Sequence, residues 1–103
     1  MAKAYLSPHY QKISNTTAVN LIPVGQLNRV RSISLANIHE SQTAVTDLYI
    51  SSPANDFYIF KGLDIPAGVT LKLEADEIEY DGSIFDLYIK LADSNDTVDV
   101  IIR

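Results

Sequence analysis

The sequence predicts an all-β domain, an antiparallel β-sandwich or jelly-roll of about seven strands. Apolar and polar residues alternate through 69–74 and through 84–92. Such a two-residue period is typical of half-buried strands, because successive side chains of a strand point to opposite faces. Turn signals recur roughly every 8–14 residues, and no segment has the apolar stripe of an amphipathic helix.

The first three strands are expected in the amino-terminal half. Residues 17–22 form the first candidate, which ends before Pro23 because proline lacks the N–H that a ladder needs. Residues 29–37 form the second, with leucine and isoleucine alternating with serine. Residues 44–50 form the third, and the Ser-Ser-Pro-Ala-Asn sequence at 51–55 ends it as a turn.

Four further strands are expected after that turn. Residues 57–61 are aromatic and β-branched, and residues 69–74 follow the turn signal Asp-Ile-Pro-Ala-Gly at 64–68. Residues 84–92 follow an Asp-Gly turn signal, and residues 97–103 follow an Asp-Ser-Asn-Asp turn.

The apolar phase of the alternating runs predicts the core. Residues 74–80 are the one stretch compatible with either a short turn of helix or a strand. The expected core residues are Ile33, Leu35, Leu48, Ile50, Leu71, Leu73, Phe85, Leu87, Ile89, Val98, Val100 and Ile102.

Residues 1–16 are expected to form an extended N-terminal arm ahead of the sandwich domain, residues 17–103. Their periodicity is poor and they contain turn sequences. The arm is nevertheless too apolar for a solvated tail, so it is expected to pack on its own domain or on a neighbouring subunit. The apolar residues concerned are Tyr5, Leu6, Tyr10 and Ile13.

Composition excludes several classes of function. The 103 residues make one domain without cysteine, which fits a reducing compartment. Residues 1–39 carry four basic residues and no acid, residues 40–103 carry four bases and thirteen acids, and the net charge is −5. Scattered bases on an acidic chain are unsuited to nucleic acid. No signal peptide or membrane span is expected. The charge asymmetry fits head-to-tail contact between copies or an arm that reaches an acidic partner, and chance is the alternative.

No catalytic, metal or cofactor site is expected. His9 and His39 lie far apart in the sequence, and no cysteine could join them in a zinc site. The acidic clusters at 74–81 and 93–99 do not have the spacing of a calcium loop, so they are interpreted as solvated turns. No nucleophile–base pair can be named, which predicts a protein that is not an enzyme.

The remaining candidates are subunit-contact residues. Tyr49, Tyr58 and Tyr88 lie on the faces of their strands opposite the expected core, where tyrosine is enriched at protein interfaces and in sugar sites. Ile101 is apolar although it points away from the core face of the last strand. These four residues, together with the apolar residues of the arm, are expected at interfaces; ordinary cross-strand packing is the alternative for the tyrosines.

The linear order of these segments resembles that of a class of short all-β structural proteins from the virions of tailed bacteriophages. The most recognisable piece is Leu-Asp-Ile-Pro-Ala-Gly-Val-Thr-Leu at residues 63–71, and the resemblance covers about residues 15–103. Where related proteins often have Gly-Asp, residues 80–86 read Tyr-Asp-Gly-Ser-Ile-Phe-Asp. The other matching segments are residues 15–24, 29–37, 44–50, 57–61, 87–92 and 98–102.

The resemblance implies a non-enzymatic virion protein, assembled in the host cytoplasm, with itself and the major capsid protein as partners. The leading role is a capsid decoration or cement protein that binds the shell in multiple copies. A neck, tail or fibre accessory protein is the first alternative. A carbohydrate-binding module for host attachment is the second.

Overall fold

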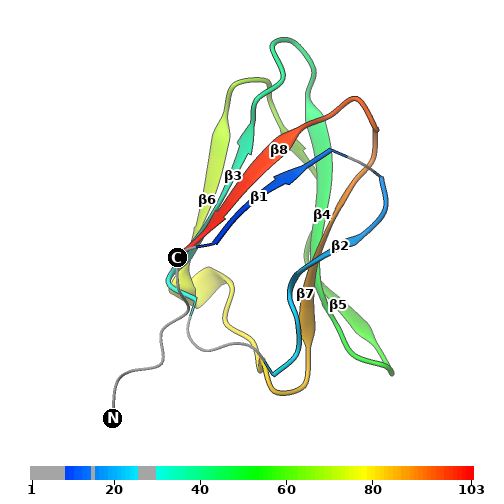
Figure 1. Cartoon of the computed structure of the whole chain (residues 1–103), viewed down its shortest axis with the longest axis vertical. Helices are drawn as coiled ribbons and strands as arrows, with labels where there is room; N and C mark the ends of the chain where they lie inside the picture. The colour runs from blue at the N-terminus through cyan, green and yellow to red at the C-terminus, as the bar shows by residue number, and fades with distance from the viewer. Residues whose placement is uncertain (1–8, 15, 26–29) are drawn as a thin grey trace.

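The computed structural model describes residues 9–14, 16–25 and 30–103. This part of the chain folds into strands joined by turns, with one short 3-10 helix (Figure 1). No helix in it is long and apolar enough to cross a membrane. The elements are β1 His9–Ile13, β2 Val19–Ile22, β3 Ser32–Asn37, β4 Ala44–Ser51, β5 Asp56–Ile65, β6 Thr70–Glu74, the 3-10 helix η1 Ala75–Glu77, β7 Asp86–Leu91 and β8 Val98–Ile102.

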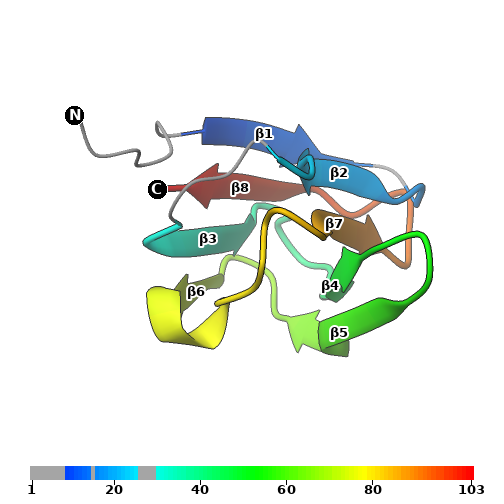
Figure 2. The same cartoon turned by 90° about the horizontal axis from the view of Figure 1, so that it is seen from below.

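The strands form two four-stranded sheets packed face to face. One sheet has the order β1-β8-β3-β6 and the other β2-β7-β4-β5. Figure 2 shows the two sheets beside each other, each with its strands in this order. Every pairing between neighbouring strands is antiparallel. The predicted all-β antiparallel sandwich is therefore confirmed, with β1 as an additional strand.

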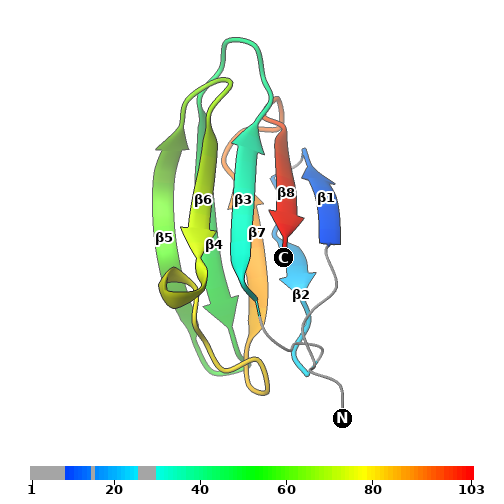
Figure 3. The ribbon, with the colours of Figure 1, turned by 90° about the vertical axis from the view of Figure 1, so that its left-hand side faces the viewer.

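The strand order is that of a jelly-roll. Paired strands follow a nested pattern: β4 with β5, β3 with β6, β2 with β7, and β1 with β8. The chain thus behaves as one long hairpin that is bent at the β4–β5 turn and rolled into two sheets. The roll is closed by the pairs β3–β8 and β4–β7. Figure 3 shows one sheet in front of the other.

The hydrophobic core lies between the sheets, where the period-two pattern puts it. Most of the expected core residues are buried there, and Ile50 and Leu71 are half-buried against the core. Phe85 is half-buried, with its ring edge-on to the exposed ring of Phe57 at 5.8 Å. The expected residues that are confirmed as buried are Ile33, Leu35, Leu48, Leu73, Leu87, Ile89, Val98, Val100 and Ile102.

Further buried residues come from places where the alternation breaks. Leu21 and Ile22 are consecutive yet both buried, because the register of β2 against β7 shifts between Asn20 and Ile22. Such an irregularity turns one extra side chain toward the interior. Ile78, just after η1, is also buried. The core residues outside the expected set are Ile13, Leu21, Ile22, Ala44, Ile65, Ile78 and Leu91.

The expected arm was wrong for residues 9–13. They form β1, which pairs with β8 from His9 opposite Ile102 to Ile13 opposite Val98. Ile13 is 2% exposed and belongs to the core. Its side chain packs inside its own domain, so the expectation that Ile13 lies at a subunit contact was also wrong. Tyr10 lies on the same strand and is 73% exposed, and Tyr5 and Leu6 lie outside the described residues.

Replacing Leu87 by alanine should lower the free energy of unfolding by about 2–5 kcal/mol, since Leu87 is fully buried between the sheets. Urea denaturation followed by circular dichroism measures this change. Lys90→Ala, at an exposed position of the same strand, is the control and should stay within about 0.5 kcal/mol of wild type. Equal effects of the two variants would contradict the strand register.

Replacing Ile13 by alanine should likewise lower the free energy of unfolding by about 2–5 kcal/mol. The control is Tyr10→Ala, because Tyr10 lies on the same strand but is 73% exposed. Deleting residues 1–14 should destabilise the domain further, since β8 would lose one of its two partner strands. A truncated protein that melts at the wild-type temperature would show that β1 is dispensable for the fold.

Candidate functional site

A row of tyrosines crosses the outward face of the β2-β7-β4-β5 sheet. Tyr49 of β4 lies directly opposite Tyr58 of β5 on one side and Tyr88 of β7 on the other. Asn20 of β2 continues the row next to Tyr88. The register thus brings together Tyr49, Tyr58 and Tyr88, the three expected contact tyrosines that lie on outward strand faces of this sheet. We call this outward surface the tyrosine face.

The rings of the tyrosine row are stacked against one another. The ring centroids of Tyr49 and Tyr88 are 5.6 Å apart with an interplanar angle of 15°. Those of Tyr49 and Tyr58 are 4.9 Å apart at 33°. The Nζ atom of Lys61 lies 4.9 Å from the centroid of the Tyr58 ring. The flat faces of the rings are therefore largely occupied within the chain, and Tyr58 remains 46% exposed.

A row of charges flanks the tyrosines on one side. Asp47 of β4 lies opposite Lys90 of β7, and its carboxylate is 3.7 Å from the Nζ atom of Lys61 on β5. The position of Lys61 depends on a shift of register between Thr46 and Leu48 that gives β5 an extra residue. Gly62 adopts a positive φ of 65° there and donates its N–H to Asp47 at 2.7 Å. We call Lys61, Asp47 and Lys90 the basic row.

An acidic row flanks the tyrosines on the other side. Ser51 of β4 lies opposite Asp56 of β5 and Asp86 of β7. The Ser51 hydroxyl donates to the Asp56 carboxylate at 2.6 Å, which holds both side chains on the outward face. The Asp86 carboxylate accepts the N–H of Val24. The tyrosine face therefore runs from the basic row through the aromatic row to this acidic row, Asp56, Ser51 and Asp86.

Tyr49, in the middle of the tyrosine row, is half-buried. Burial raises the pKa of Tyr49 above its usual value, and the charges of Asp56 and Asp47 add to this effect. The Tyr49 phenol therefore stays protonated over the physiological range. It offers a hydroxyl donor on an otherwise aromatic surface, as buried interface tyrosines do.

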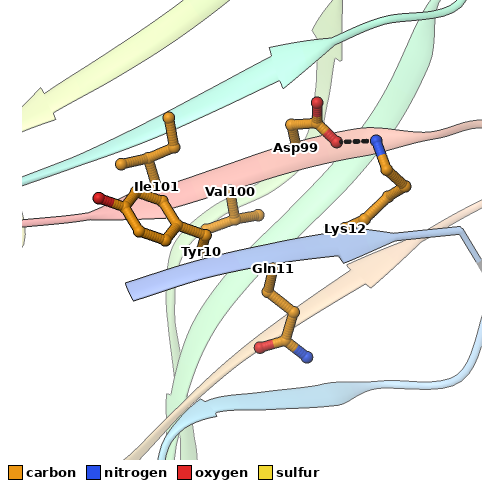
Figure 4. Close-up of a pocket in the computed structure, with 6 residues that line it drawn as sticks. All are labelled: Tyr10, Gln11, Lys12, Asp99, Val100 and Ile101. Carbon is orange, nitrogen blue, oxygen red and sulfur yellow. Dashed lines mark hydrogen bonds and ion pairs between the residues drawn. The ribbon is translucent and has the colours of Figure 1, made fainter. Parts of the chain in front are cut away.

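The opposite sheet carries a smaller apolar surface. Tyr10 of β1 lies opposite Ile101 of β8 on the outward side, and the two line a hollow of about 300 Å³ (Figure 4). The Nζ atom of Lys12 is 2.5 Å from the Asp99 carboxylate beside them. Ile101 is half-exposed, and β8 is an interior strand because β1 and β3 pair with its two edges.

The titratable clusters of the described residues serve turns. The Nδ1 atom of His39 accepts the N–H groups of Ser41 and Gln42 at 3.1 and 2.9 Å. His9 lies on β1. Within residues 9–14, 16–25 and 30–103, no group of three or more histidine, cysteine or acidic side chains could hold a metal ion.

The acidic clusters cap the backbone, as their interpretation as turns predicts. The Asp81 carboxylate accepts the hydroxyl and the N–H of Ser83 at 2.6 and 2.9 Å. These two hydrogen bonds lower the pKa of Asp81, and the bond from the Ser83 hydroxyl has the larger effect. Asp93 accepts the N–H of Asn95, and Glu77 accepts the N–H of Glu74 at the start of η1.

A buried polar cluster links the loop between β3 and β4 to the end of β5 and to the loop between β7 and β8. The sequence pattern did not predict this cluster. The amide of Asn37 donates to the carbonyls of Gln42 and Ile65, both at 2.8 Å. The Gln42 amide donates to Asp96 at 2.6 Å. Asn37 and Asp96 are each 1% exposed. Asn37 occupies the last position of an alternating strand, which is the only signal that could have found it.

Comparison with models of protein families finds no match for this sequence, and a search of curated proteins finds no similar protein either.

Replacing Tyr80 by phenylalanine should leave the free energy of unfolding unchanged or raise it by up to about 1 kcal/mol. The reason is that the Tyr80 hydroxyl is buried with no hydrogen-bond partner in the described part of the chain. Thermal unfolding at pH 7 measures the effect. A loss of stability would show that the hydroxyl has a partner.

Tyr80 should also make the free energy of unfolding depend on pH in the alkaline range. Burial, with the charge of Asp86 adding to it, raises the pKa of Tyr80 to about 12 from 10.0. Above pH 10 the unfolded chain loses the phenol proton that the folded chain keeps, so stability should fall as pH rises from 10 to 12. Tyr80→Phe should remove part of this decline, while Tyr49 retains its own raised pKa.

Proposed function

We propose that this protein is a non-enzymatic structural component of a tailed-bacteriophage particle, and specifically a capsid decoration or cement protein present in multiple copies. In this role its partners are other copies of itself and the major capsid protein. The proposal combines the jelly-roll fold, the linear resemblance to short virion proteins and the chemistry of the tyrosine face. Fold alone does not imply function, so the face carries the argument.

The single observation behind the proposal is the row of three partly exposed tyrosines on the outward face of one sheet. Tyrosines are enriched among the residues that dominate protein interfaces, because each buries a large ring and still offers a hydroxyl. Tyr49, Tyr58 and Tyr88 are held in place by stacking and by the strand register. Binding through such a face costs little conformational entropy, since its rings are already ordered.

Binding by surface burial is the mechanism. Each copy covers part of a neighbouring subunit with the tyrosine face, and charges on both sides of the row select the orientation. The Tyr10–Ile101 surface on the opposite sheet offers a second contact. A protein with contacts on two opposite faces can join two neighbours, which is what a cement protein of a shell must do.

Two other roles are kept as alternatives. A neck, tail or fibre accessory protein would use the same kind of contact in another part of the particle. A carbohydrate-binding module is disfavoured by the ring geometry. Sugars stack on the flat face of an aromatic ring, whereas the rings of Tyr49 and Tyr88 cover each other's faces at an interplanar angle of 15°.

Electron microscopy of the virion tests the proposal directly. Density for the jelly-roll on the outer surface of the shell is the expected result. Density at the neck, tail or fibres would favour the first alternative, and absence of the protein from purified particles would overturn the proposal.

Replacing both Tyr58 and Tyr88 by serine should reduce binding to shells lacking this protein by at least about tenfold, the size of effect found for interface aromatics. Co-sedimentation with such shells measures binding. Val69→Ser, at an exposed apolar position outside both proposed surfaces, is the control for loss of an exposed apolar side chain. Ile101→Lys tests the Tyr10–Ile101 surface separately. Unchanged shell binding by the Tyr58 and Tyr88 double variant would exclude the tyrosine face.

A further inference from the structure

The tyrosine face is complementary to itself. Its basic row contains Lys61 on β5 and Lys90 on β7, and its acidic row contains Asp56 on β5 and Asp86 on β7. The tyrosine row lies between them. Each strand that carries a lysine on one side of the tyrosines thus carries an aspartate on the other side.

This arrangement selects one way of packing two copies face to face. A twofold axis along the tyrosine row reverses the strands but keeps β5 over β5 and β7 over β7. It lays the basic row of each copy on the acidic row of its partner, and each tyrosine on the same tyrosine. A twofold axis along the strands would instead lay lysines on lysines and aspartates on aspartates, which is repulsive.

We propose that the protein forms a symmetric dimer through the tyrosine face, with the twofold axis along the tyrosine row. Lys61 pairs with Asp56 of the second copy, and Lys90 pairs with Asp86. Asp47, at the centre of the basic row, lies opposite Ser51 of the second copy. The contact is isologous, so each pairing occurs twice. This inference rests on the proposed function, because it identifies the partner of the face as a second copy.

The size of the face predicts the strength of the dimer. At roughly 4.8 Å between strands and 3.3 Å per residue, a sheet of four strands as long as the eight-residue β4 has a face of roughly 500 Å². Two such faces bury roughly 1,000 Å², which is in the range of weak, transient interfaces. The dimer should therefore be weak in dilute solution and more populated where copies are crowded on one surface.

Charge reversal on β5 tests the orientation. Asp56→Lys places two lysines together in the dimer, and Lys61→Glu places two acids together. Each variant alone should raise the dimer dissociation constant at least about tenfold. An equimolar mixture of the two variants should form heterodimers, because Lys61 of one then meets Asp56 of the other, and the two new side chains also attract. Sedimentation equilibrium from about 10 μM to about 1 mM covers the affinities of weak interfaces.

Lys72→Glu is the matched control for Lys61→Glu. Both lysines are exposed and each has one surface carboxylate near its Nζ atom, at 3.6 Å for Lys72 and 3.7 Å for Lys61. Lys72 lies on the other sheet, so its reversal should leave dimerisation unchanged. Circular dichroism confirms that every variant is folded. Raising NaCl from about 0.05 M to about 0.5 M should weaken the wild-type dimer, since exposed charges are screened.

The proposal is overturned if the wild-type protein stays monomeric at about 1 mM, a concentration that reveals even weak contacts. It is also overturned if the folded mixture of Asp56→Lys and Lys61→Glu variants remains monomeric. Binding to shells by a monomeric wild-type protein would refute the dimer and leave the proposed function standing. A protein that dimerises but is absent from purified particles would support the dimer and refute the proposed function.

Discussion

The structure depends on the pairing of the two halves of the chain across the β4–β5 turn. Every strand before that turn finds its ribbon partner after it, ending with β1 against β8. This nesting turns the apolar side chains of the strands toward the space between the two sheets. As a result, Val98, Val100 and Ile102 of the last strand belong to the same core as Ile13 of the first. A slip of one residue in any pair would turn the whole buried set of that strand toward solvent.

Local periodicity was sufficient to predict the class of fold and most of the core. The runs at 69–74 and 84–92 alternate clearly, and Leu73, Leu87 and Ile89 are buried as that pattern requires. Periodicity does not predict a strand in a segment whose apolar residues do not alternate. Residues 9–13 lack an alternating apolar pattern, since Tyr10 is apolar but exposed and Gln11 is polar but half-buried. Only the backbone pairing with β8 makes this segment a strand, and that pairing cannot be read from local sequence.

The candidate site was also predictable from the sequence only in part. Alternation alone indicates that Tyr49, Tyr58 and Tyr88 face away from the core, but their assembly into one row depends on the register of three strands. Two shifts of register on β5 set the phase of Tyr58 and Lys61 relative to β4. Sequence reasoning had no means of locating these irregularities. It therefore identified the tyrosines individually and missed the charged rows, which are defined only by what lies opposite on the neighbouring strand.

The nested pairing also has a consequence for synthesis of the protein. His9 is separated in sequence from its partner Ile102 by most of the chain, so β1 is synthesised well before the strand with which it pairs. Contacts between residues distant in sequence slow folding, because a long loop must be closed before the pairing stabilises it. Until β8 pairs with β1, the backbone of β1 lacks its partner and Ile13 lacks the core in which it is buried. Unpaired strands and transiently exposed apolar residues of this kind promote aggregation of folding chains.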